Sequence, residues 1–357
     1  MIQAGNECCK GSRWKHSTQA FELTMLRNTA RLRKRVLEGS YRPEKTYDFI
    51  LMERGKRRHI RSHKISDRQL YKSLCAHEIK PAIASRILHS NAASQVGKGT
   101  DYSIKLFRQA LAKAYRKWRR DFYVITFDYH DYFASIPHDR IPDAVGLTDE
   151  RSGAILKQYI GVFSGDKGIG IGGEPSQDIA VVYPSRLDRM LACDSRVLAS
   201  GRYMDDGYAI CHTRDEARAV LGSIRRMSER LSLILNEKRT RISCMAKDSV
   251  TWLKKRTSIS PSGRIIMKLT RKNIRDEIRR IRYQRKETDA GRMPFRAVLE
   301  SMVCWCSYAG KYNSHRQMLR VLDVFAQAFD LPWNFVRELF KRRHKGWLTR
   351  GSRLRTS

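Results

Sequence analysis

The spacing of apolar residues along the chain predicts helices through most of its length, with a few short strands between them. Five segments repeat apolar residues at the spacing of an amphipathic helix: 16–40, 66–88, 102–120, 149–161 and 175–193. Thr213 and Glu216 form the capping-box pattern that opens another helix. β-branched and aromatic residues dominate 122–128 and the hairpin-like segment 47–60, which predicts strands. Together these elements indicate an α+β fold in which helices lie against a sheet.

The pattern changes at about Thr270. Beyond this residue the chain is densely basic, and its apolar residues recur at helical spacing as far as Phe340. The tail that follows is rich in Arg and Lys. These features predict a separate basic, helical subdomain at the C-terminal end.

Charge narrows the class of partner. The chain of 357 residues holds 71 Lys and Arg against 36 Asp and Glu, which gives a formal net charge of +35. Such a surplus is typical of proteins that bind nucleic acid, where counterion release supplies much of the affinity. No apolar run is long enough for a membrane span and the first ten residues hold no signal-peptide core, so we expect a cytoplasmic protein. The 8 cysteines lack paired C-x-x-C spacing, which favours reduced thiols over a zinc site.

Candidate chemistry begins at the tetrad Tyr203-Met204-Asp205-Asp206, which has the turn residues and flanking strand pattern of a tight hairpin. Adjacent carboxylates repel, and a divalent cation is their natural partner, although many Asp-Asp pairs are only solvated turns. The strand expected at 122–128 ends in a third acid, Asp128. If it lies beside the hairpin, the three carboxylates can hold two Mg²⁺ ions about 3.5–4 Å apart, as in nucleotidyl transfer.

Other motifs exclude competing enzyme classes. The stretch from Gly168 to Gly173 satisfies G-x-G-x-x-G, but it follows a polar loop instead of a strand, which the dinucleotide-binding fingerprint requires. The chain contains no G-x-S-x-G elbow and no Walker-type phosphate loop. A dinucleotide-binding, hydrolase or P-loop function is therefore disfavoured.

Taken in order, Asp128, the glycine-rich loop and the Asp-Asp hairpin resemble the motifs of reverse transcriptases, over about residues 41–253. Asp128 to His138 is similar to the palm motif D-x-x-x-[YF]-F-x-x-I-x-H, and Tyr203 to Asp206 fits YxDD. Two further elements carry the resemblance: Gly55-Lys56-Arg57-Arg58 with Asp67-Arg68, similar to GKxR…DR, and Leu235-Asn236-Glu237-Lys238, similar to L-N-x-x-K.

The resemblance implies a right-hand polymerase with an antiparallel palm sheet that carries the catalytic carboxylates. Residues 1–120 would form the N-terminal region and fingers, and 121–255 the palm, with a nucleotide-pocket loop near 150–178. Residues 265–357 would form a helical basic thumb and tail. The family uses two Mg²⁺ ions to copy a template RNA into cDNA from a primer and deoxynucleoside triphosphates.

Individual roles follow from the same resemblance. Asp128, Asp205 and Asp206 would be the metal ligands, and Lys238 would protonate pyrophosphate. Nucleotide-binding positions are Lys56, Arg58, Phe133, Ile171, Gly172 and Gln177, with Phe133 as the aromatic gate that disfavours a 2′-OH. Trp252 and Leu253 fall where the family grips the primer terminus, although Trp252 could equally belong to the core.

The nucleotide-pocket loop departs from the common pattern QGxxxSP. Ile171-Gly172-Gly173-Glu174-Pro175-Ser176-Gln177 instead reads IGxxxSQ, which is similar to the enzymes of bacterial and phage diversity-generating retroelements. Those enzymes make errors at adenines, and loss of a hydrogen-bonding Gln beside the templating pair favours such infidelity. The resemblance also implies a small basic accessory protein as a partner. A retron-like or phage-defence reverse transcriptase, and a non-catalytic RNA-binding scaffold, remain alternatives.

Overall fold

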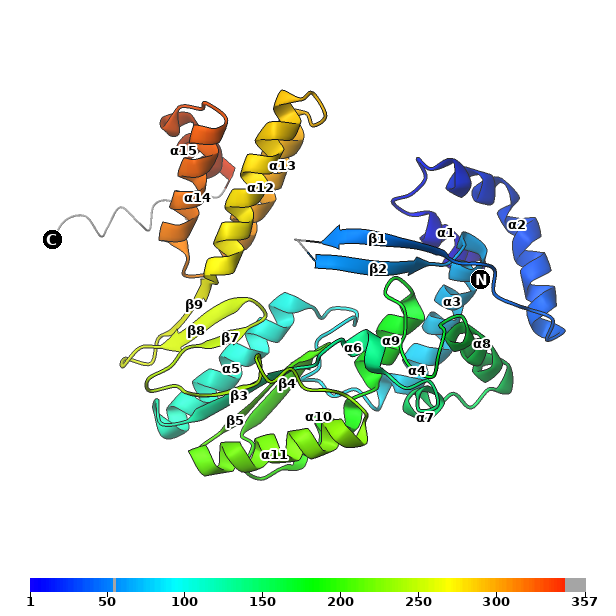
Figure 1. Ribbon diagram of the computed structural model, residues 1–357, viewed down its shortest axis with the longest axis horizontal. Helices are drawn as coiled ribbons and strands as arrows, with labels where there is room; N and C mark the ends of the chain where they lie inside the picture. Colours follow the sequence, from blue (N-terminus) through cyan, green and yellow to red (C-terminus); the bar gives the residue numbers. More distant parts are fainter. Residues whose placement is uncertain (54–55, 344–357) are drawn as a thin grey trace. The chain divides into compact units, whose positions relative to one another are not determined.

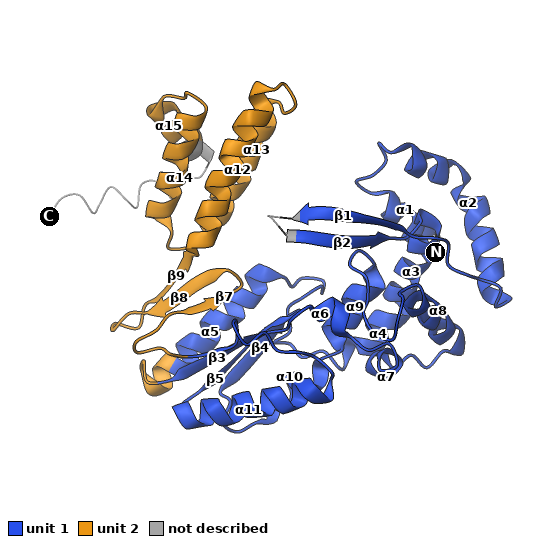
Figure 2. Ribbon diagram, in the orientation of Figure 1, with its two compact units in different colours: residues 1–114, 122–242 blue, residues 115–121, 243–357 orange. Residues whose placement is uncertain are grey.

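The computed structural model describes residues 1–53 and 56–343 (Figure 1). Within these ranges, only the backbone is described for Glu53, Lys56 and residues 340–343. The chain forms two compact units (Figure 2). One comprises residues 1–114 and 122–242, and the other residues 115–121 and the chain from 243 onward. Helices and antiparallel sheets occur in both units, so the predicted α+β class is confirmed.

A four-stranded sheet in the order β4-β5-β3-β6 organises the first unit. Its strands are β3 (Tyr123–Asp128), β4 (Ala199–Tyr203), β5 (Asp206–Cys211) and β6 (Arg241–Cys244). β3 and β5 are antiparallel, and their register places Asp128 directly opposite Asp206. β3 forms here because its β-branched and aromatic side chains, including Val124, Ile125 and Phe127, are buried in the core. The sheet thus delivers two predicted site residues to the same end of neighbouring strands.

Helices on the sheet fix its position. α11 (Arg214–Arg230) packs on β3 and β5, and α10 (Ser185–Cys193) on β4 (Figure 1). α11 begins with the predicted capping box, in which Thr213 and Glu216 satisfy each other's backbone N–H groups. α5 (Thr100–Trp118) contributes Phe107, whose ring packs edge-on against Tyr208 of β5 with centroids 4.8 Å apart.

The remaining elements of the first unit lie N-terminal to the sheet strands or between them. They are α1 (Ile2–Cys9), α2 (His16–Leu37), β1 (Tyr47–Glu53), β2 (Lys56–Ser62), α3 (Ile65–Leu74), the π-helix η1 (Cys75–Ile79), α4 (Lys80–Ala84), α6 (Tyr132–Ser135), α7 (Ile141–Val145), α8 (Glu150–Gly161) and α9 (Glu174–Val182). β1 and β2 form the predicted hairpin as a separate two-stranded sheet.

The single helix predicted over 175–193 is wrong. The structure has two helices, α9 and α10, with a break at Tyr183 and Pro184. Pro184 has no N–H to donate and its ring would clash with the carbonyl of Ala180, so the helix cannot continue. The carbonyl of Ala180 accepts a hydrogen bond from the hydroxyl of Tyr132 instead.

The second unit has its own core. A three-stranded antiparallel sheet, β7 (Val250–Trp252), β8 (Lys255–Ile259) and β9 (Ile265–Leu269), precedes four helices. These are α12 (Arg271–Asp289), α13 (Phe295–Ala309), α14 (His315–Ala328) and α15 (Trp333–Arg343). Ile281, Val298 and Phe325 lie at the centre of this core. Within the described residues, no helix of either unit is both long and apolar enough to cross a bilayer.

Candidate active site

A tight hairpin turn between β4 and β5 presents the Asp-Asp pair. Tyr203 pairs with Asp206, so Met204 and Asp205 occupy the two turn positions. Met204 has φ +55°, the left-handed value that the first central residue of a type II′ turn requires. Because this position normally favours glycine, a methionine there costs on the order of 1–2 kcal/mol. The turn is therefore held against a local conformational preference.

The hairpin and β3 bring the three predicted acids together. Carboxylate oxygens of Asp128, Asp205 and Asp206 lie within 4.8 Å of one another. The side chain of Asp128 is only 5% exposed. Its Oδ1 is buried and accepts no hydrogen bond from the described residues, so one oxygen of the cluster is left without a partner.

Burial and mutual repulsion perturb these acids. Burial raises the pKa of Asp205, and the charge of Asp128 raises it further. The pKa of Asp206 is raised to about 8, first by burial and then by the charges of Asp205 and Asp128. A bound divalent cation would lower the pKa values of these acids because it stabilises their charged forms. Three convergent hard oxygen ligands with one unpartnered oxygen fit Mg²⁺.

Arg239 is a site residue that the sequence reasoning missed. Its Nη1 donates to Oδ2 of Asp128 at 2.7 Å, and the Nδ2 of Asn236 donates to the same oxygen at 3.3 Å. Lys238, the predicted general acid, is exposed, and no contact joins its side chain to the carboxylates among the described residues. The spacing of L-N-x-x-K, counted from Leu235, reaches position 239 and would have found the arginine.

The predicted nucleotide-binding residues all belong to the first unit. Arg58 lies in β2, close enough to Asp205 for its charge to lower the pKa of that carboxyl. The side chain of Lys56, at the start of β2, lies outside the described residues. Phe133 is half-buried in α6, edge-on to Tyr132 with ring centroids 5.8 Å apart. Burial raises the pKa of Tyr132, and the charge of Asp205 raises it further.

The glycine-rich loop is attached to the β1–β2 hairpin. The backbone N–H of Arg61 donates to the carbonyl of Ile171 at 3.2 Å, and Ile60 and Ile171 form a parallel bridge. Gly172 has φ +127°, and a Cβ there would lie 3.1 Å from the carbonyl oxygen of Arg61, so a side chain at this position would be strained. Gln177 is exposed and accepts a 3.4 Å hydrogen bond from Ser94.

The predicted primer grip lies in the second unit. Trp252 is 2% exposed, which favours its alternative role as a core residue. Leu253 and Lys254 have φ +44° and +65°, and they form the two-residue turn between β7 and β8. The assignment of Trp252 and Leu253 to the primer terminus stays a prediction.

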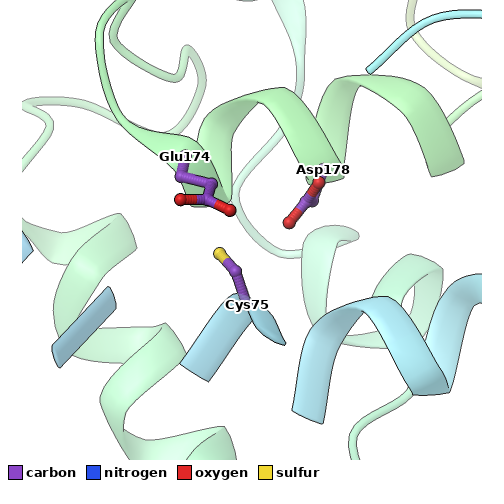
Figure 3. Close-up of side chains that lie close together, drawn as sticks. All are labelled: Cys75, Glu174 and Asp178. Atoms are coloured by element: carbon purple, nitrogen blue, oxygen red, sulfur yellow. The ribbon is translucent and has the colours of Figure 1, made fainter. Parts of the chain in front are cut away.

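A second cluster of potential ligands, Cys75, Glu174 and Asp178, was not predicted. Their side chains converge from η1 and α9 within 4.8 Å of one another (Figure 3). However, Lys72 at 3.2 Å and Lys80 already pair with Glu174. Burial raises the pKa of the Cys75 thiol and raises that of Asp178 to about 6. We interpret this cluster as an ion-pair network that fastens α9 to the helices around it, since two ammonium groups would oppose a metal ion.

Comparisons with known proteins add no assignment. The chain matches no protein-family model, and a search of curated proteins finds no match either. The functional interpretation therefore depends on the motifs and on the geometry of the carboxylate cluster.

Proposed function

We propose that this protein is a reverse transcriptase, an RNA-directed DNA polymerase with a right-hand arrangement of fingers, palm and thumb. The convergence of Asp128, Asp205 and Asp206 within 4.8 Å carries the proposal, because these acids come from segments that are 77 residues apart in the sequence. An incidental acidic turn would not place a third, largely buried carboxylate on a neighbouring strand. The net charge of +35 supports a polyanionic template and product.

The residues around the cluster then have definite roles. When bound, Mg²⁺ would activate the primer hydroxyl and stabilise the pyrophosphate that leaves. Asp128, Asp205 and Asp206 would hold the ions, and Arg58 would neutralise the incoming triphosphate. Phe133 would stand beneath the sugar and disfavour a 2′-OH. Arg239 would stabilise negative charge near Asp128, but a guanidinium keeps its proton and so is a poor general acid.

The loop at Ile171 supports an error-prone enzyme of a diversity-generating retroelement. The Ile171 side chain offers no hydrogen bond where the related pattern has Gln, while its backbone is held by Arg61. Selection beside the templating base would therefore rest more on shape. The partners would be a template RNA, a primer and its cDNA, deoxynucleoside triphosphates and a small basic accessory protein. The other candidates are a retron-like or phage-defence enzyme with the same chemistry, and an RNA-binding scaffold.

Primer extension tests the chemistry. The purified chain is given a DNA primer annealed to RNA, deoxynucleoside triphosphates and Mg²⁺. We expect extension by the wild type and by Asp131→Asn, and none by Asp205→Ala. Asp131 is a suitable control because it is 75% exposed and lies three residues from Asp128. RNA binding without extension by the wild type would favour the scaffold, and extension by Asp205→Ala would refute the metal assignment.

Sequencing of the cDNA tests whether the enzyme belongs to a diversity-generating retroelement. We expect misincorporation concentrated opposite template adenines, and an even error spectrum would favour the retron-like or defence alternative. Ile171→Gln should reduce those errors by about fivefold, because one restored hydrogen bond is worth on the order of 1 kcal/mol. An unchanged spectrum in Ile171→Gln would remove the loop as the source of infidelity.

A further inference from the structure

Arg202, the residue before the tetrad, is a fully buried cation. Its side chain is 1% exposed, and it forms a bidentate ion pair with Asp188 of α10, with Nε and Nη2 each 2.8 Å from a carboxylate oxygen. Asp188 is 7% exposed. Because an unpaired buried charge is strongly destabilising, each of the two residues depends on the other. They form a neutral ion pair in the interior of the first compact unit.

The guanidinium donates hydrogen bonds beyond this pair, to two backbone carbonyls. Nη1 donates to the carbonyl of Met204 at 2.9 Å, and Nη2 donates to the carbonyl of Val181 at 2.6 Å. The backbone of Arg202 is also held, because its N–H donates to Ser90 at 3.3 Å. One planar group therefore joins the turn to the end of α9 and to α10.

The carbonyl of Met204 belongs to the peptide that leads into Asp205. Two forces act to displace this peptide: the left-handed backbone of Met204, and repulsion of Asp205 by the carboxylate of Asp128, with oxygens of the two groups within 4.8 Å of each other. Because Asp188 neutralises Arg202, the guanidinium restrains the turn through its hydrogen bond more than through its charge. A lysine could keep the ion pair but could not reach Asp188, Met204 and Val181 in one plane.

We propose that Arg202 is a positioning residue, which sets the Met204–Asp205 peptide so that the carboxylates converge before a metal ion binds. This inference rests on the proposed polymerase function, and it adds a buried residue to the support of the same site. The alternative is that Arg202 and Asp188 only stabilise the fold.

The first test measures Mn²⁺ binding to the full chain without nucleic acid, with electron paramagnetic resonance as the readout. The second measures primer extension over a range of Mg²⁺ concentrations. Arg202→Lys should weaken Mn²⁺ binding by about 10–100-fold, the usual effect of losing a residue that orients metal ligands. High Mg²⁺ should restore much of its extension activity. Asp188→Asn removes the ion pair but leaves the bond to Met204, so it should lower thermal stability more than Mn²⁺ affinity.

A double-mutant cycle separates positioning from stability. Met204→Gly relieves the left-handed turn, so Arg202→Lys should cost less Mn²⁺ affinity in that background than in the wild type. A purely structural ion pair would show no such coupling. If Arg202→Lys does not fold, Arg202→Met with Asp188→Leu removes the buried pair as a unit and should show the same loss of affinity.

Different results would overturn the proposed function and the role of Arg202. A wild type that binds no Mn²⁺, or whose binding survives Asp205→Asn, would overturn the proposed function. A wild type that binds Mn²⁺ through Asp205, with undiminished affinity in folded Arg202→Lys, would overturn the role of Arg202 alone.

Discussion

Asp205→Asn should stabilise the protein in a chelator and abolish polymerisation at the same time. Carboxylate oxygens in the cluster lie within 4.8 Å, and at an effective dielectric constant of about 20 two unit charges at that separation repel by ~3 kcal/mol. Partial protonation of Asp206 and the nearby Arg239 reduce this repulsion. We therefore expect the free energy of unfolding in EDTA to rise by about 1–2 kcal/mol in Asp205→Asn.

Urea unfolding with EDTA and with Mg²⁺ measures both effects. Mg²⁺ should stabilise the wild type, because a ligand of the folded state raises the free energy of unfolding, and it should stabilise Asp205→Asn much less. Asp131→Asn should match the wild type within about 0.5 kcal/mol in both solutions. A loss of stability in Asp205→Asn without Mg²⁺ would refute the repulsion argument, and equal stabilisation of all three proteins by Mg²⁺ would refute the metal site.

Three other predictions use the same cluster and its neighbours. Arg239→Ala should lower primer extension by about tenfold or more while changing the free energy of unfolding by less than about 1 kcal/mol, because its side chain is 55% exposed. Lys238→Ala should have a smaller effect on extension than Arg239→Ala, because the Lys238 side chain is exposed. A larger effect of Lys238→Ala would support the predicted role of Lys238 as the general acid. The folded state binds a proton at Asp206 up to about pH 8 and the unfolded state only up to about pH 4, so in EDTA the free energy of unfolding should fall as pH rises through this window. In Asp206→Asn the free energy of unfolding should fall less over the same pH range. Identical pH profiles of the wild type and Asp206→Asn would contradict the raised pKa of Asp206. Phe133→Ala should raise ribonucleotide incorporation by about 10–100-fold relative to deoxynucleotides, and competition between the two substrates measures this ratio.

Local sequence patterns were sufficient to predict the strand and the hairpin that carry Asp128, Asp205 and Asp206. The β-branched run that ends at Asp128, the turn signal Asp205-Asp206-Gly207, and the capping box at Thr213 are each encoded within a few neighbouring residues. Their convergence was expected only from the resemblance, because α6 to α10 and β4 lie between β3 and β5 along the chain and local patterns do not pair such distant strands. The register of Asp128 opposite Asp206 needed the structure, since a shift of one residue would turn a carboxylate to the other face.

Long-range polar contacts could not be read from the sequence in the same way. Arg239 reaches Asp128 across 111 residues, and Arg202 is one of 71 Lys and Arg residues in the chain. β8 was missed because Lys255 and Arg256 give it a polar surface pattern, although Lys255 is buried in the second unit. Such contacts depend on tertiary packing, which hydrophobic periodicity does not specify.

The attachment of the glycine-rich loop through main-chain atoms has a consequence for how this protein can evolve. The hydrogen bond from Arg61 ends on the carbonyl of residue 171 and does not involve its side chain. In the proposed polymerase, substitutions at that position would therefore change the chemistry presented to a base pair while the loop keeps its attachment to the β1–β2 hairpin. Copying accuracy would then be adjustable by single mutations, with little penalty in folding.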